Sequence, residues 1–329
     1  MEDIDIPAIL KSLDYSVEHS ENIIGSGAYG RIYKIPYKDG FLAVKVPLVE
    51  MKYRYAEPVP PPKTTDRYKV VHVPDMKTQF LRREATILSH MSKVSSPYIL
   101  RFKYVLRKNP YTLATEFLEG YEELYQLIDR ENLDWNCIFE SMIHGLMHVH
   151  ANDAAHSDIH NSNIMVNVQT DSIRYIDFGL ACQKTVPEFD HCIPGISTNR
   201  APETFDQDSL SVDEAQKADI WSLGITIYAC ICALPGSSIA DMMPRFMTRD
   251  VATKDEILEW HALAIDDRYI SEIKRLYRID MMKLLNLDPT KRDLEQSIVK
   301  SFILNVPAPS NVQEQLPADT VPETVPPAM

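Results

Sequence analysis

The run His156-Ser157-Asp158-Ile159-His160-Asn161-Ser162-Asn163, followed downstream by Asp177-Phe178-Gly179, decides the fold of this chain. Asp158 can orient an attacking hydroxyl, and Asn163 and Asp177 supply an amide and a carboxylate, whose oxygens are ligands that Mg²⁺ accepts. Transfer of a phosphoryl group from a nucleotide needs these groups in this order. A carboxylate and an amide this close occur often by chance, but Asp-Phe-Gly at this distance makes coincidence remote.

A glycine run, Gly25-Ser26-Gly27-Ala28-Tyr29-Gly30, lies near the start of the chain. It matches a dinucleotide-binding fingerprint as well as a loop that covers phosphates. The dinucleotide fingerprint requires a helix to begin at the glycines, whereas residues 31–35 alternate like a strand and meet Pro36. A Walker loop is excluded because Gly30 is followed by Arg31 and Ile32. Taken alone, the run fits a phosphate-covering hairpin or a structural turn about equally well.

Lys45 ends the apolar stretch Leu42-Ala43-Val44-Lys45, where an unpaired ammonium group would be costly. An acidic partner would remove that cost, and Glu84 lies on the next predicted helix. The apolar spacing predicts that this helix runs from Phe80 to Met91, after strands within residues 22–46. Further strands are expected around 98–106 and 111–118, and helices at 134–151, 215–234, 252–265 and 270–286.

Together these motifs resemble the eukaryotic protein kinase family over about residues 23–302. Three later segments strengthen the resemblance and disfavour small-molecule kinases: Ala201-Pro202-Glu203, Asp219-Ile220-Trp221-Ser222-Leu223-Gly224 and Leu287-Asp288-Pro289-Thr290-Lys291-Arg292. The resemblance implies an α+β, bilobal protein-kinase fold, with a small β-rich N-lobe carrying one main helix, a larger helical C-lobe, and a nucleotide cleft between them. It also implies an ion pair between Glu203 and Arg292.

The expected domain boundaries combine this resemblance with the proline-rich composition of two stretches. They are an N-terminal extension at 1–20, the N-lobe at 21–118 with a proline-rich insertion at about 50–77, the C-lobe at 119–305, and a disordered proline-rich tail at 306–329.

The resemblance also assigns roles, with ATP and Mg²⁺ as cofactors. Asp158 would orient the substrate hydroxyl, Asn163 and Asp177 would hold the metal, and Lys45, paired with Glu84, would bind phosphates. His160 stands where a lysine usually steadies the transferred phosphate, and it would replace that lysine while protonated. The residues expected around the nucleotide are Ile24, Gly25, Ser26, Gly27, Ala28, Tyr29, Gly30, Ile32, Ala43, Lys45, Thr115 as gatekeeper, Glu116 and Leu118.

Four departures from the family pattern mark a divergent member. Ser157 replaces the arginine that clamps an activation-loop phosphate, and His160 replaces the lysine. Ile196 and Asn199 replace the usual threonine and tyrosine of the substrate segment. We expect a kinase of protein serine and threonine hydroxyls, because Gly195 opens that segment and a tyrosine-kinase catalytic loop is absent. The alternative is a catalytically weak pseudokinase that acts as a nucleotide-binding scaffold.

Composition limits the partners. The net charge of −13 argues against nucleic acid, which needs a basic face. No apolar run is long enough to span a membrane, and the acidic N-terminus predicts no signal peptide. The five scattered cysteines predict reduced thiols and an intracellular protein, cytoplasmic or nuclear, including a viral protein acting in a host cell. Besides a protein substrate, the basic insertion at 50–77 would bind a regulatory partner or be a tolerated surface loop.

Overall fold

The computed structural model describes residues 22–27, 30–47, 76–107, 111–195, 198–244, 246 and 252–299. The chain divides into two compact units, Met1–Val299 and Lys300–Met329. All described residues belong to the first unit. The extension at 1–20, most of the insertion at 50–77 and the tail at 306–329 lie outside the described residues.

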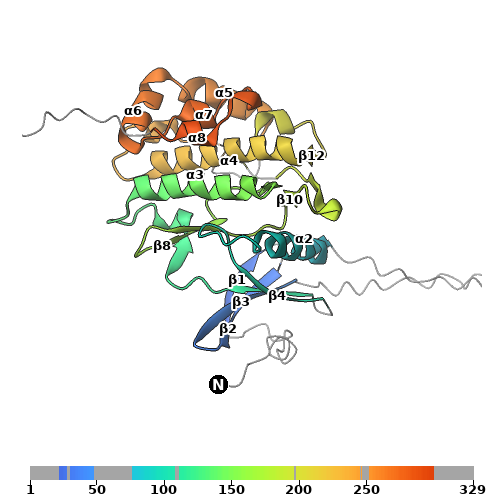
Figure 1. Cartoon of the computed structure of the whole chain (residues 1–329). Coiled ribbons are helices and arrows are strands. Elements are labelled where there is room, and N and C mark those ends of the chain that lie inside the picture. The colour runs from blue at the N-terminus through green and yellow to red at the C-terminus, as the bar shows by residue number, and fades with distance from the viewer. Residues whose placement is uncertain are drawn as a thin grey trace, which may run out of the picture. The chain divides into compact units, whose positions relative to one another are not determined.

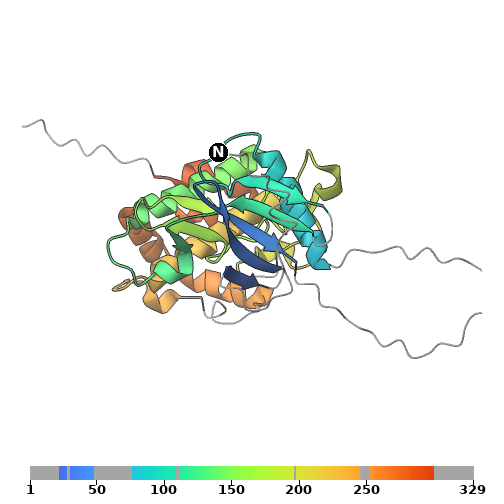
Figure 2. The same ribbon diagram turned by 90° about the horizontal axis from the view of Figure 1, so that it is seen from below.

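A five-stranded antiparallel sheet forms the N-terminal part, in the order β1-β2-β3-β5-β4 (Figures 1 and 2). The strands are β1 (Ile23–Gly27), β2 (Gly30–Tyr37), β3 (Gly40–Val46), β4 (Phe102–Leu106) and β5 (Thr112–Glu116). Side chains alternate along β3, so Leu42, Val44 and Val46 are buried while Ala43 and Lys45 keep partial exposure. The register pairs Lys45 with Ile32 and Ala43 with Thr115. These four residues therefore occupy neighbouring positions across β2, β3 and β5.

Helix α2 (Met76–Met91) packs on this sheet and buries Leu81, Glu84, Leu88 and Met91. It begins four residues earlier than the apolar spacing indicates, within the expected insertion. The spacing missed that first turn because residues 76–79 contribute no buried apolar side chain.

The second part is mainly helical, as expected for the α+β fold. Helices α3 (Trp135–Ala151) and α4 (Val212–Ala233) pack against each other (Figure 1). Asp134 caps the first turn of α3, and Ser211 and Glu214 form a capping box at the start of α4. Buried side chains of α4, among them Trp221 and Tyr228, occupy the centre of the core. The remaining helices are α5 (Lys254–Ala264), α6 (Asp267–Tyr277), α7 (Met281–Leu284) and α8 (Leu294–Ser297).

One helix prediction is wrong. The segment 270–286 was expected to be a single helix, but α6 ends at Tyr277 and α7 begins at Met281. Arg278 adopts a left-handed conformation (φ 57°) and caps α6 through a backbone hydrogen bond to Lys274. Apolar periodicity continues across this break, so spacing alone does not reveal it.

Short strands and 3₁₀ turns connect the helices and carry the chemistry-bearing loops. The strands are β6 (Tyr121–Glu123), β7 (Ala154–Ala155), β8 (Ile164–Asn167), β9 (Ile173–Tyr175), β10 (Cys182–Gln183), β11 (His191–Cys192) and β12 (Leu210–Ser211). The 3₁₀ turns are η1 (Leu124–Leu127), η2 (Pro187–Phe189), η3 (Pro202–Thr204), η4 (Ala240–Met242) and η6 (Pro289–Lys291). None of the helices in the described part combines the length and apolar character that a bilayer crossing requires.

Candidate active site

Lys45 and Glu84 form the predicted ion pair. The Lys45 Nζ lies 2.8 Å from Glu84 Oε2 and 3.0 Å from Asp177 Oδ1, so one ammonium group serves two carboxylates. Burial alone would lower the pKa of Lys45, but Glu84 and Asp177 more than offset it and raise that pKa. Burial raises the pKa of Glu84 to about 7, against the pull of Lys45. A buried strand, a helix and a loop thus converge on one cation.

The loop between β7 and β8 carries Asp158 and Asn163. The amide nitrogen of Asn163 donates to the backbone oxygen of Asp158 at 2.9 Å and to Asp158 Oδ2 at 3.1 Å. Its backbone oxygen accepts from Ile176 N–H at 3.0 Å, which brings Asn163 beside the residue that precedes Asp177. Burial would raise the pKa of Asp177, but Lys45 lowers it below its usual range. Asp158, Asn163 and Asp177 therefore come together as the spacing predicted.

This donor set fits Mg²⁺. The Asn163 side chain bonds to Asp158 through its nitrogen, which leaves Oδ1 as an oxygen ligand beside the ionised carboxylate of Asp177. Mg²⁺ takes one or two carboxylates and completes its shell with water and substrate phosphates. Elsewhere in the described part, no cluster of three or more histidine, cysteine or acidic side chains has the arrangement of a metal site.

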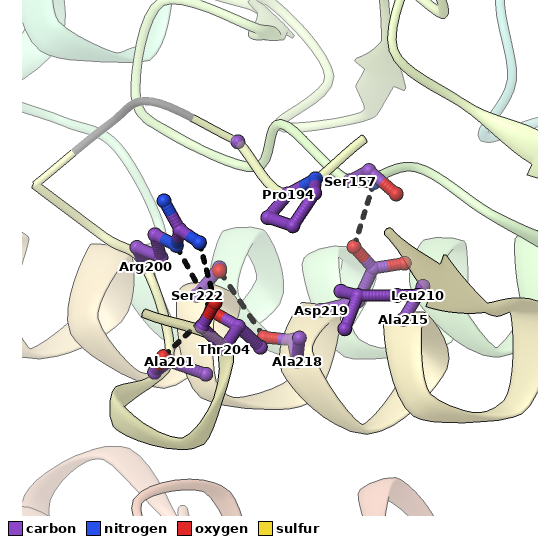
Figure 3. A pocket seen from close by; sticks show the side chains of 11 residues that line it. Ser157, Pro194, Arg200, Ala201, Thr204, Leu210, Ala215, Ala218, Asp219 and Ser222 are labelled. Carbon is purple, nitrogen blue, oxygen red and sulfur yellow. Dashed lines mark hydrogen bonds between the residues drawn. The ribbon is translucent and has the colours of Figure 1, made fainter. Parts of the chain in front are cut away.

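Asp219, on α4, holds the start of the loop that carries Asp158. Its Oδ2 accepts from His156 N–H at 2.7 Å, and its Oδ1 accepts from Ser157 N–H at 2.8 Å (Figure 3). Ser157 has a φ of 65°, a left-handed conformation that the two bonds to neighbouring amides help to maintain. Burial lowers the pKa of His156, whose ring bonds to the Ile176 oxygen at 3.0 Å and lies against Phe178. The fixed backbone just before Asp158 limits where its carboxylate can point.

A small cavity of about 20 Å³ lies beside Ser157, lined partly by Gly195, Arg200 and Ser222 (Figure 3). The Ser157 Oγ is buried without a hydrogen-bond partner among the described residues. Arg200 donates to Thr204 instead: its Nε bonds to the Thr204 hydroxyl at 3.1 Å, and its NH2 bonds to the Thr204 backbone oxygen. A Cβ atom at Gly195 would lie 2.6 Å from the backbone oxygen of Ser157, so only glycine permits this close approach to the loop that carries Asp158.

His160 lies next to Asp158. Its Nε2 is 3.6 Å from Asp158 Oδ2, and its Nδ1 accepts from Ser162 N–H at 3.2 Å. The ring is thereby held with Nε2 toward the carboxylate. This places the imidazole at the site, while its role toward a phosphate stays a prediction.

The expected nucleotide residues of the described part lie on β1, β2, β3 and β5 and just after β5. Thr115 is buried on β5 and its hydroxyl contacts the Ala43 oxygen at 3.4 Å. The Glu116 N–H donates to the Arg101 oxygen at 3.0 Å, and the Glu116 carbonyl accepts from the Thr115 hydroxyl at 3.3 Å, so the contact of Glu116 with an adenine edge stays a prediction. Ile24 is 49% exposed on β1, and Ile32 packs over Gly25. The other expected nucleotide residues in the described part are Ser26, Gly27, Gly30 and Leu118.

Gly30 shows why the run needs glycine at its end. A Cβ atom there would lie 2.4 Å from the Val46 oxygen, which any larger residue would meet. Ala28 and Tyr29, at the tip of the run, lie outside the described residues.

The predicted ion pair between Glu203 and Arg292 is also present. Arg292 NH1 lies 2.5 Å from Glu203 Oε1, and NH2 donates to Oε2 at 2.8 Å. The Arg292 side chain is fully buried, while that of Glu203 keeps 26% exposure. The pair joins η3 to the segment before α8 and contacts none of the predicted catalytic groups, so its role is structural.

Two features escaped the sequence analysis. Cys182 and Cys192 form a disulfide between β10 and β11, so the expectation of reduced thiols is wrong for them; Cys137, Cys230 and Cys232 are free. Arg82 and Arg83 precede Glu84 on α2 and contact the segment between those strands. The basic run beside the paired glutamate was the available signal for this contact.

Comparisons with known proteins agree with this geometry. The family model described as "Protein kinase domain" matches residues 63–302. A calcium/calmodulin-dependent protein kinase kinase of Caenorhabditis elegans is 28% identical over 225 residues, covering 63% of this chain and 40% of that protein. Mitogen-activated protein kinase kinase kinase 17 of Arabidopsis thaliana is 26% identical over 259 residues, covering 73% of this chain and 66% of that protein. The serine/threonine-protein kinase Nek6 of Oryza sativa subsp. japonica is 26% identical over 229 residues, covering 67% and 37% respectively.

Proposed function

This chain belongs to the protein kinase domain family, and we propose that it transfers the γ-phosphate of ATP to serine or threonine hydroxyls of protein substrates. The observation that carries the proposal is the convergence of Lys45, Asp158, Asn163 and Asp177 at one site. The glycine run and Lys45 precede residues 63–302, which the family model matches. Support for this part of the site comes instead from the sheet register and the Lys45–Glu84 ion pair.

In the proposed reaction, Asp158 accepts a hydrogen bond from the substrate hydroxyl and orients it for attack. Asn163 fixes the Asp158 carboxylate through its amide nitrogen at 3.1 Å and offers its oxygen to a metal ion together with Asp177. Bound Mg²⁺ would neutralise charge on the phosphates. Lys45, held by Glu84, supplies the fixed cation for the phosphates on the sheet side. Preference for serine and threonine is supported by Gly195 and by the names of the relatives.

The regulatory and cellular parts of the proposal rest on sequence alone. The insertion at 50–77 precedes and enters α2, the helix that carries Glu84, and a partner bound there would act on that helix. We retain an intracellular location as part of the proposal. The chain spans less than two thirds of the relatives it matches, so the substrate and partners of the whole protein are proposals too.

The direct test is phosphate transfer from γ-labelled ATP, with Mg²⁺ and generic protein substrates, by wild type, Asp158→Asn and Asp129→Asn. Asp129 is an exposed carboxylate outside the site and serves as the matched control. Because Asp158→Asn loses general-base assistance, its rate of phosphate transfer should fall about a hundredfold or more, whereas the rate of Asp129→Asn should stay at the wild-type value. Transfer that survives in Asp158→Asn would point to a contaminating kinase. Nucleotide binding without transfer by wild type would favour the pseudokinase alternative.

A further inference from the structure

Helix α2 contacts the segment from Ala181 to Cys192, which contains β10 and β11. Arg83 NH1 donates to the Ala181 oxygen at 3.1 Å and to the His191 oxygen at 3.1 Å. Those two carbonyls lie at the two ends of the segment, next to the paired Cys182 and Cys192. One guanidinium group therefore holds both ends at once.

The same guanidinium covers the middle of the segment. The Arg83 Cζ lies 4.7 Å from the centre of the Phe189 ring, in η2. Burial lowers the pKa of Arg83, yet arginine stays charged in proteins. Arg82 adds an ion pair with Glu188 at 2.7 Å, but both side chains are about half exposed, so this pair contributes little. Arg83 carries most of the contact.

The backbone oxygens that accept from Arg83 are next to or within strands that pair with the helical part of the chain. Strand β10 pairs with β7, which leads directly into the loop of Asp158, and β11 pairs with β12 at the start of α4. Because a helix moves as a rigid element, a contact that holds Arg83 also limits rotation of α2 and its shift along the axis, and so fixes the position of the neighbouring Glu84. Glu84 reaches Lys45 at 2.8 Å, a distance that a shift of about one ångström would break.

The usual alternative, an arginine clamp on an activation-segment phosphate, is absent at Ser157. The other nearby arginines are engaged: Arg200 with Thr204, and Arg174 with the Pro97 and Ile173 oxygens. Backbone carbonyls and an aromatic ring, unlike a phosphate, are present in every copy of the chain.

We propose that Arg83 is a positioning residue for phosphoryl transfer, which holds α2 against β10 and β11 so that Glu84 meets Lys45 without a phosphate on the activation segment. This inference rests on the proposed kinase function. Arg83 itself touches neither substrate nor nucleotide, so its removal should act on the rate of transfer more than on ATP binding.

The test uses phosphatase-treated full-length protein and measures kcat and the KM for Mg²⁺–ATP. The variants are Arg83→Met, Arg83→Lys, Phe189→Leu, the double variant Arg83→Met/Phe189→Leu, and Arg275→Met as an exposed arginine control. Arg83→Met should lower kcat about tenfold and change KM less than about threefold. Arg83→Lys should fall between, because an ammonium group lacks the planar fork that spans two carbonyls and stacks on a ring. The double variant should be no slower than Arg83→Met, since both changes break one contact.

Amide exchange of α2, with α3 as internal reference, gives a readout besides activity. Faster exchange confined to α2 in Arg83→Met supports the proposal. Two results with an active wild type would overturn the inference while leaving the kinase function intact. One is a kcat of Arg83→Met within twofold of wild type. The other is a double variant whose kcat falls by the product of the two single-variant factors. A wild type without transfer activity would instead reject the function on which the inference rests.

Discussion

Replacing Arg292 by methionine removes a buried charge while keeping most of the apolar volume of the side chain. Arg292 donates to Glu203 through two nitrogens, to the Asn286 oxygen at 2.8 Å and to the Lys217 oxygen at 2.9 Å. Its guanidinium also lies 5.0 Å from the Trp221 ring centre. The methionine side chain can still cover Trp221, but it supplies none of these hydrogen bonds.

The expected cost follows from the groups left behind. Breaking a buried ion pair by removing one partner typically costs about 3–5 kcal/mol, because the other charge stays buried without compensation. Glu203 keeps 26% exposure, so water recovers part of that loss and the lower end of the range applies. The Asn286 and Lys217 carbonyls each lose a hydrogen-bond donor, and water replaces part of that loss. This raises the expected loss of unfolding free energy by about 1 kcal/mol in total. We expect about 4 kcal/mol less unfolding free energy, equivalent to a Tm lower by about 10 °C for a domain of this size.

Urea unfolding and thermal melting would measure this loss, with Arg275→Met as the control. Arg275 is 70% exposed and its nearest partner is 4.0 Å away, so that variant should stay within about 0.5 kcal/mol of wild type. The double variant Glu203→Leu/Arg292→Met should recover stability relative to Arg292→Met, because no charge remains buried alone. A loss below about 1 kcal/mol in Arg292→Met, or a double variant as unstable as the sum of both single variants, would refute this reasoning.

Four other outcomes are expected. Because Ser157 leaves an activation-segment phosphate without its usual clamp, phosphatase treatment should lower turnover less than about tenfold, and a larger loss of labelled-phosphate transfer would contradict this. Turnover of His160→Lys at saturating Mg²⁺–ATP should gain most over wild type toward pH 9, because the introduced lysine keeps its positive charge there. Parallel profiles from pH 6 to 9 for wild type, His160→Ala and His160→Lys would reject a charge role. Burial lowers the pKa of His261, so the unfolded chain binds a proton more readily than the folded chain, and the unfolding free energy should fall as pH drops below about 6.5. His261→Phe should reduce this pH dependence, measured by urea unfolding at pH 7.5 and 5.5. Shortening residues 53–70 should leave nucleotide affinity unchanged but alter basal rate, partner binding or substrate choice, and a variant unchanged in all three would exclude a docking role.

The sequence was most informative where function demands particular groups at short spacing. The Asp158–Asn163 contact and the Lys45–Glu84 pair follow from motifs whose residue types have few other uses together. The Glu203–Arg292 pair is far apart in sequence, yet the resemblance to a known family placed both partners correctly. Such pairs are predictable because each residue is recognisable from its own neighbours.

Contacts that use the backbone or join unremarkable residues left no comparable signal. Arg83 donates to carbonyls 98 and 108 positions away, and every residue offers a carbonyl. The break between α6 and α7 depends on the conformation of Arg278, which periodicity does not encode. Cys182 and Cys192 meet because β10 and β11 lie side by side, a relation set by tertiary structure rather than by cysteine count.

The departures from the family pattern have a common physical consequence around the substrate segment. Asn199, in place of the usual tyrosine, is buried, donates to Thr226 Oγ1 at 2.7 Å, and accepts at its backbone oxygen from Ser222 at 2.9 Å. Arg200, next to it, donates to the Thr204 hydroxyl. These acceptors are uncharged, so the bonds require neither a phosphate nor a particular protonation state. Where Ser157 replaces the arginine of the phosphate clamp, Asn199 and Arg200 are therefore held by hydrogen bonds to groups that are present in every copy of the chain.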